Sequence, residues 1–164
     1  MNIFWEELTF GLPDASQWAR IVIRLLAATV FGALIGIQRE RVGKAAGVRT
    51  HILVMLGTTV FVLSGSIFGM SSEGLSRVIQ GIITGIGFIG AGSILKLDKE
   101  RNILGLTTSA GIWMTAAIGV TIGLGSLGLA LLATIITLII LAVVGSIEFQ
   151  INRHRSPNNK IDAG

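Results

Sequence analysis

The sequence has few ionisable side chains and no cysteine. Charged residues make up 13% of the 164 residues, whereas soluble domains usually have about 25%. The absence of cysteine excludes disulfides, thiolate metal sites and a cysteine nucleophile. Residues 102–147 contain no ionisable side chain, and a single helix of that length would extend about 70 Å, roughly twice what a bilayer core needs. This segment is therefore predicted to cross a membrane twice, with the reversal at Gly123, Gly125 and Ser126.

Aspartate and histidine are too few for several kinds of enzyme. The aspartates are Asp14, Asp98 and Asp162, so the pair at membrane depth that an intramembrane aspartyl protease needs is missing. His51 is the one histidine outside the tail, and at the expected entrance to a helix it does not meet Ser93 as a hydrolase would require. The sequence also has no phosphate loop. It therefore predicts neither an enzyme nor a cofactor.

Five apolar segments are expected to form transmembrane helices, and they are residues 21–37, 52–70, 78–95, 103–122 and 127–147. Ten of the thirteen basic residues lie in the first loop, the third loop and the C-terminal tail. Short cytoplasmic loops carry the excess of lysine and arginine, so the N-terminus is predicted outside and the C-terminus inside. The expected fold is an all-α polytopic membrane protein with about five transmembrane helices.

Three regions follow from this topology. Residues 1–17 are expected to form an outer interfacial segment, residues 18–149 the five-helix transmembrane domain, and residues 150–164 a basic, disordered cytoplasmic tail. Because the positive charge is divided among membrane loops, it does not indicate nucleic-acid binding. Membrane lipids are the expected surroundings, in a multi-pass protein of the bacterial inner membrane.

Glycine is abundant, with 22 residues, and it recurs at helical spacing. The segment GIGFIGAG at 85–92 matches a dinucleotide fingerprint, but it lies within an expected membrane span and lacks the required strand before it. Two interpretations remain: close helix packing, or a locally broken helix that exposes backbone carbonyls to a solute or ion. The glycines predicted to pack helices are Gly32, Gly36, Gly81, Gly85, Gly87, Gly90, Gly92 and Gly119. So many helix faces with small residues favour a homo-oligomer, most simply a dimer.

A few polar residues are candidates for function. Arg24 lies about one turn inside the first helix, where it either reaches back to the membrane surface or holds a carboxylate, carbonyl or phosphate within the bundle. At the inner face, carboxylates could bind Mg²⁺, although the basic residues around them oppose this, so no metal site is assigned. The candidate functional polar cluster is Arg24, Glu40, Arg49, His51 and Asp98.

Four motifs in order resemble the MgtC/SapB family of bacterial inner-membrane proteins: LLAATVFGALIGIQRE at 25–40, GVRTH at 47–51, GIGFIGAG at 85–92 and GLTTSAGIW at 105–113. The resemblance covers about residues 20–145. The family typically has Glu-Arg-Glu where this chain has Gln38, Arg39 and Glu40. Many members also carry a cytoplasmic C-terminal domain, and the expectation here is the short form without it.

The resemblance implies a protein tied to growth under Mg²⁺ limitation and, in pathogens, to virulence, partly through restraint of the F-type ATP synthase as a membrane partner. A regulatory protein is therefore the first expectation. The alternative is a small transporter or channel for Mg²⁺ or another cation, with the glycine-rich third helix lining the path. The sequence places no acidic residue at membrane depth, where cation-coupled carriers commonly have one, and this favours the regulator.

Overall fold

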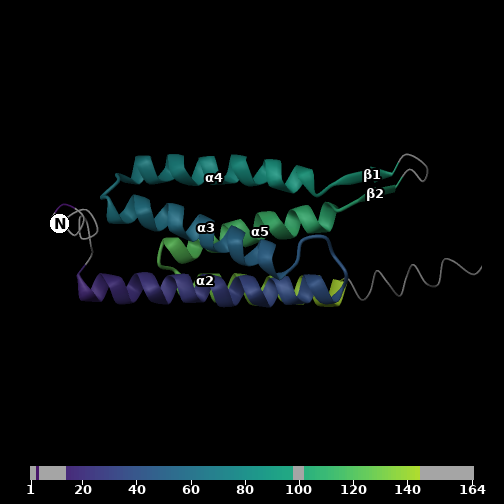
Figure 1. Ribbon diagram of the computed structural model, residues 1–164, viewed down its shortest axis with the longest axis horizontal. Helices are drawn as coiled ribbons and strands as arrows, with labels where there is room; N and C mark the ends of the chain where they lie inside the picture. The colour runs from purple at the N-terminus through teal and green to yellow at the C-terminus, as the bar shows by residue number, and fades with distance from the viewer. Residues whose placement is uncertain (1–2, 4–13, 98–101, 145–164) are drawn as a thin grey trace, which may run out of the picture.

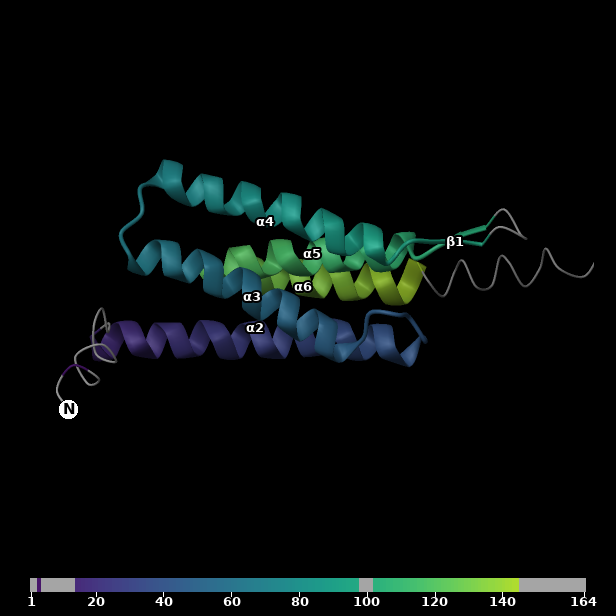
Figure 2. The same cartoon turned by 45° about the horizontal axis from the view of Figure 1, so that its top comes forward.

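The computed structural model describes residue 3 and residues 14–97 and 102–144. Five α-helices run roughly side by side (Figures 1 and 2): α2 (Ala15–Arg41), α3 (Val48–Ile67), α4 (Ser72–Gly92), α5 (Leu106–Gly123) and α6 (Leu127–Ile139). A π-helical turn, η1 (Ile140–Val144), continues α6. The prediction of an all-α polytopic membrane fold is confirmed.

Four helices, α2 to α5, are long and apolar enough to cross a membrane. Helix α6 and the first four residues of η1 together form a fifth apolar helix, residues 127–143, which is shorter. Its length of about 25 Å is close to the thickness of a bilayer core, at about 1.5 Å per residue. The expected number of helices is therefore found, with the last one at the lower limit of a membrane span.

Local chemistry explains where α2 begins. The Asp14 carboxylate accepts hydrogen bonds from the Gln17 backbone N–H at 2.7 Å and from the Ser16 hydroxyl at 2.9 Å. These bonds, the backbone one first, hold the pKa of Asp14 below its ordinary value. The helix therefore starts at Ala15 rather than at residue 21, because the N-cap residue, and not the first apolar residue, determines where the helix begins.

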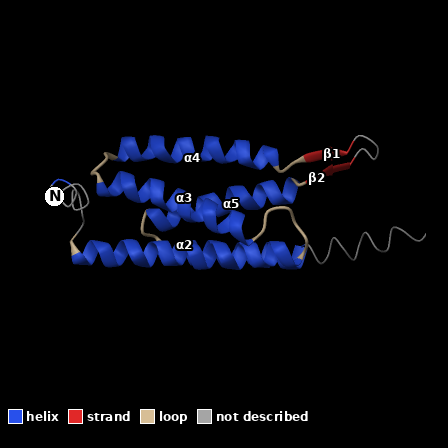
Figure 3. Cartoon of the chain, in the orientation of Figure 1, coloured by secondary structure: helices blue, strands red, loops and turns tan. Residues whose placement is uncertain are grey.

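The connection between α4 and α5 differs from the predicted loop. Strands β1 (Leu95–Leu97) and β2 (Asn102–Leu104) pair antiparallel, with Leu95 opposite Leu104 (Figure 3). The predicted ends of the third and fourth helices, at residues 95 and 103, were therefore wrong. Gly105 separates β2 from α5 with φ of 95°, and a Cβ there would meet the Ser93 carbonyl. Helix α5 therefore begins only after Gly105, because a backbone with this φ cannot be part of a right-handed helix.

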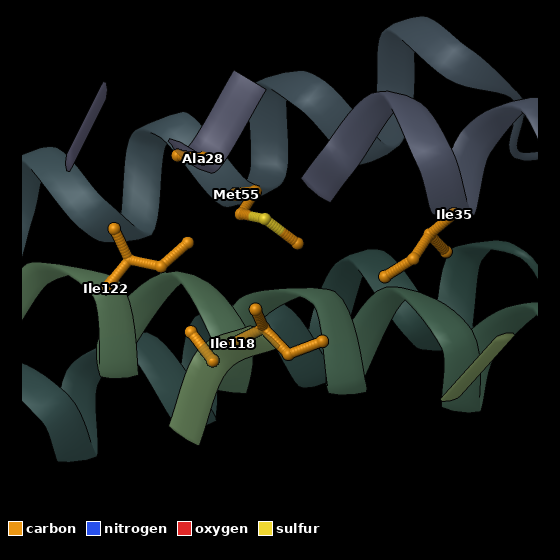
Figure 4. Close-up of a cluster of buried hydrophobic side chains, with 6 residues drawn as sticks. Ala28, Ile35, Met55, Ile118 and Ile122 are labelled. Carbon is orange, nitrogen blue, oxygen red and sulfur yellow. The ribbon is translucent and has the colours of Figure 1, made fainter. Parts of the chain in front are cut away.

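The predicted reversal near residue 125 is confirmed. Helix α5 ends at Gly123, Gly125 has φ of 89°, and α6 begins at Leu127. The α3–α4 connection lies at the end of the bundle where α2 begins, and this turn faces the same end but lies part of the way along α2, whereas the hairpin lies at the opposite end (Figure 1). The core between the ends consists of Ala28, Ile35, Met55, Ile118, Ile122 and Ala130, from α2, α3, α5 and α6 (Figure 4).

Candidate functional site

Arg39 is buried in the last turns of α2. Its side chain is 2% exposed, and among the described residues it is the one charged side chain inside the bundle. One guanidinium nitrogen, Nη2, lies 3.4 Å from the Thr108 hydroxyl of α5. Nε is buried, with no hydrogen-bond partner among the described residues. A buried arginine with a single long hydrogen bond costs free energy that packing must offset, so its position calls for a functional reason.

His51 lies in the first turn of α3 and is 1% exposed. Its Nδ1 is 2.8 Å from the Thr115 hydroxyl oxygen, and that hydroxyl donates to the Gly111 carbonyl at 2.8 Å. Because the Thr115 proton is used in this way, the Thr115 oxygen accepts from Nδ1–H of His51. The other ring nitrogen, Nε2, is buried and has no partner in the part of the chain that the structure describes. We refer to Arg39, His51, Thr108 and Thr115 as the Arg39 cluster.

Two glycines of α2 bring the helices of this cluster together. A Cβ on Gly32 would lie 2.9 Å from the Ile52 Cα, and one on Gly36 would lie 2.5 Å from the Val48 Cα. Such distances are possible only without a side chain, so α2 and α3 touch backbone to backbone. Gly32, Gly36 and Arg39 are all buried and share one helix face, which directs the guanidinium inwards.

Two further predicted packing glycines have close neighbours. A Cβ on Gly119 of α5 would lie 2.7 Å from the Met55 carbonyl of α3. One on Gly90 of α4 would lie 2.6 Å from the Ser109 hydroxyl. These positions set the spacing of α3, α4 and α5 around the cluster.

The remaining predicted packing glycines of α4 are different. At Gly81, Gly85, Gly87 and Gly92, an added Cβ would meet no described atom within 4 Å. They do not pack helices together within the described part of the chain, and packing against a second chain stays a prediction. Helix α4 is also unbroken from Ser72 to Gly92. The interpretation of a locally broken helix is therefore wrong, since its backbone carbonyls are used in helical hydrogen bonds.

Arg24 caps the C-terminal end of α5. Its Nη1 donates to the Gly123 carbonyl at 2.9 Å, and its side chain is half-buried. Of the two interpretations left open by the sequence, the structure shows the hydrogen bond to a backbone carbonyl. A positive charge at the C-terminus of a helix also interacts favourably with the helix dipole. Arg24 thus holds the turn between α5 and α6, far from the Arg39 cluster.

Two other predicted site residues, Glu40 and Arg49, lie near His51 at the start of α3, outside the buried cluster. Glu40 is exposed, and its Oε2 accepts from the Val48 backbone N–H at 3.1 Å, which caps the start of α3. Arg49 is exposed, and Asp98 lies outside the described residues. Of the four predicted residues that the structure describes, His51 alone belongs to the Arg39 cluster.

Sequence reasoning did not select Arg39, Thr108 or Thr115. A usable signal was present, because Arg39 follows Gly32 and Gly36 on one helix face and Thr115 follows Gly111 by one turn. Around the buried pair, exposed Arg41, Lys44 and Arg49 form a basic rim at this end of the bundle. We call this end the basic end.

Within the described residues, no three histidine, cysteine, aspartate or glutamate side chains are placed to hold a metal ion. The ion pair found there joins Glu73 and Arg77, one turn apart on α4, at 2.6 Å and largely exposed. The Arg39 cluster therefore offers buried hydrogen-bond donors and a positive charge, and hydroxyl groups are their partners.

The sequence is similar to a protein family and to several known proteins. The sequence profile of the MgtC family matches residues 25–149. YhiD of Escherichia coli strain K12, whose name describes a candidate magnesium transporter, is 39% identical over 140 residues, covering 81% of this chain and 64% of YhiD. SrpB of Synechococcus elongatus is 41% identical over 142 residues, covering 80% of this chain and 78% of SrpB.

Protein MgtC of Salmonella typhimurium is 45% identical over 117 residues, covering 71% of this chain and 49% of that protein. The chain thus spans less than two thirds of YhiD and about half of MgtC. No solved structure matches it.

Proposed function

The chain belongs to the MgtC family, and from this membership we propose that it is a regulatory protein of the bacterial inner membrane that supports growth when Mg²⁺ is limiting. It does so by acting on a membrane partner rather than by moving the ion or by catalysis. The partner proposed from the family resemblance is the F-type ATP synthase. The name of YhiD supports the connection to magnesium.

The observation that carries the choice of regulator over transporter is the buried guanidinium of Arg39. A divalent cation that crossed the bundle between α2, α3 and α5 would pass a fixed positive charge with 2% exposure. Such a charge raises the barrier for a cation, since charge interactions are strong where water is excluded. This arrangement therefore opposes conduction along this path.

The alternative path, along the glycine-rich helix, has the wrong chemistry for a hydrated ion. A groove of about 610 Å³ lies between α3 and α4, and it is lined almost entirely by apolar side chains, among them Leu53, Phe61 and Ile86. Mg²⁺ gives up its water reluctantly and prefers oxygen ligands. This groove supports the transporter alternative less well than it supports contact with lipid or protein.

The Arg39 cluster is the proposed source of regulation. Two of its nitrogens are buried without partners in residues 14–97 and 102–144, and each unpaired buried donor or acceptor costs about 1–3 kcal/mol. A change in the packing of α2 against α3 and α5 would relieve that cost. The basic rim of Arg41, Lys44 and Arg49 would attract an acidic partner surface to the same end.

The test compares two arginines of α2, one buried and one exposed. Arg39→Leu should abolish growth at low Mg²⁺ while the amount of protein in the membrane is kept or increased, because it removes an unpaired buried charge. Arg41→Leu, the matched exposed control, should change growth little. Proteoliposomes that contain the pure protein should show no saturable Mg²⁺ uptake. Uptake that Arg39→Leu alters would replace the regulator with the transporter, and normal growth of the Arg39→Leu strain would remove the cluster from the mechanism.

A further inference from the structure

Helix α4 lies at the edge of the bundle, beside α3 and α5 and away from α2 (Figures 1 and 2). Ile86 and Gly90 are its only buried residues, and they face α5. Most of the surface of α4 therefore points away from the chain.

The outward surface of α4 contains a continuous row of small and polar residues. The row consists of Glu73, Arg77, Gln80, Thr84, Gly87 and Ala91, and all six are exposed. Their spacing alternates between four and three residues, which is the a/d repeat of two helices that pack along their length. We call this row the α4 seam.

The α4 seam is unlike the surfaces that face lipid elsewhere in the chain. The exposed face of α2 consists of Val22, Leu26, Val30, Leu34 and Ile37, and that of α6 includes Leu129, Leu132, Ile136 and Ile139. Lipid tails favour such large apolar side chains, whereas small residues are enriched where transmembrane helices touch. The seam thus has the composition of a protein contact.

Gln80 strengthens this argument because it is a polar side chain on a membrane span. Its backbone carbonyl accepts from Thr84, but its side-chain amide makes no hydrogen bond within the described residues. An amide facing hydrocarbon without a partner is costly. A hydrogen-bonding group on another helix would remove that cost.

From these observations we propose that the α4 seam binds the same seam of a second copy of this chain in a parallel, two-fold symmetric dimer. The polar side chains of two identical seams can form hydrogen bonds with each other. A glutamine amide is both donor and acceptor, so Gln80 can pair with Gln80 of the partner subunit. Glu73 and Arg77 occupy neighbouring layers of the seam and form an ion pair within one helix, and the long arginine side chain can also reach the layer of the partner subunit's Glu73.

The residues beside the seam fit the same arrangement. Ile83 and Phe88 occupy the g and e positions, which meet across a parallel pair of helices. They are 48% and 85% exposed, and Phe88 is the most exposed of the large apolar side chains described. At Gly87 an added Cβ would meet no described atom of its own chain within 4 Å, so the close approach that this glycine allows is available to a second copy.

Disulfide cross-linking tests the interface directly, because the chain has no cysteine of its own. Thr84→Cys, Gly87→Cys and Ala91→Cys, oxidised in native membranes, should each give a band of twice the chain mass that reductant removes. Ile89→Cys is the matched control, since Ile89 lies at the same depth and is 49% exposed but is off the seam. It should give no such band.

A second variant separates packing from chance collision. Gly87→Leu, made together with Ala91→Cys, should lose the dimer band, because a leucine at the centre of the seam holds the helices apart. Gly128→Leu in the same background should keep the band, because Gly128 also has open space but lies on α6. Equal cross-linking at Ile89 and at the seam, or an unchanged band with Gly87→Leu, would overturn the proposal. A product of any other mass would assign the seam to a different protein.

Discussion

Gly36→Ala should weaken the bundle at the point where α2 crosses α3. A Cβ at this position would lie 2.5 Å from the Val48 Cα, 3.0 Å from the Val48 backbone nitrogen and 3.1 Å from the Gly47 carbonyl oxygen. These are all backbone atoms, which cannot rotate out of the way as the end of a long side chain can. The added methyl group must therefore push the two helices apart.

The size of the effect follows from two opposing terms. Alanine is better than glycine inside a helix by about 0.8–1 kcal/mol, while overpacking a tight contact costs about 1–3 kcal/mol. Gly57→Ala on α3 gains the first term without the second, because a Cβ there meets none of the described atoms within 4 Å. The free energy of unfolding of Gly36→Ala should therefore be about 1–3 kcal/mol lower than that of Gly57→Ala.

Circular dichroism during titration of mixed micelles with sodium dodecyl sulfate measures this difference. Gly36→Ala should also impair growth at low Mg²⁺, since Arg39 follows on the same face and its contact with Thr108 depends on the approach of α2. Gly57→Ala should leave growth unchanged. Equal unfolding free energies for the two variants would show that α2 and α3 do not meet at Gly36, and the account of the Arg39 cluster would fail with it.

Two further predictions concern the opposite ends of the bundle. With an impermeant maleimide on intact cells, Ser72→Cys should be labelled and Ala45→Cys should not, because the basic end is predicted to face the cytoplasm; the reverse pattern would invert the topology. Arg24→Ala should lower the free energy of unfolding by about 1.5–3 kcal/mol, the typical contribution of a hydrogen bond to a charged group, since it leaves the Gly123 carbonyl without this donor. Arg20→Ala, an exposed control one turn earlier, should have little effect, and equal losses in both variants would exclude a specific role for the cap.

Much of the fold could be predicted because it depends on local properties. The long uncharged segment 102–147 is too long to cross a bilayer once, so it has to turn back and cross again. Glycine at residue 125 provides the backbone conformation for that turn. The hairpin was missed because its two strands have three residues each and depend on pairing with each other. Apolar composition alone does not distinguish such a strand from the end of a helix.

The candidate site was harder to predict than the fold. His51 was selected as an unusual residue, but Arg39 was treated as part of a charged helix end. An arginine two residues from the end of a helix usually reaches water. Here the backbone contact at Gly36 draws α2 against α3, and it encloses the guanidinium instead.

The sequence by itself determined that this is a membrane protein of five helices from the MgtC family, because composition, segment length and motif order are properties of the chain alone. The tertiary structure decided which face of each helix meets a neighbour. Gly36 and Gly87 have the same chemistry, yet one contacts backbone and the other faces away from the chain. The rotation of a helix about its axis is fixed by all its partners together, so the distinction between a packing glycine and an open one requires the assembled bundle.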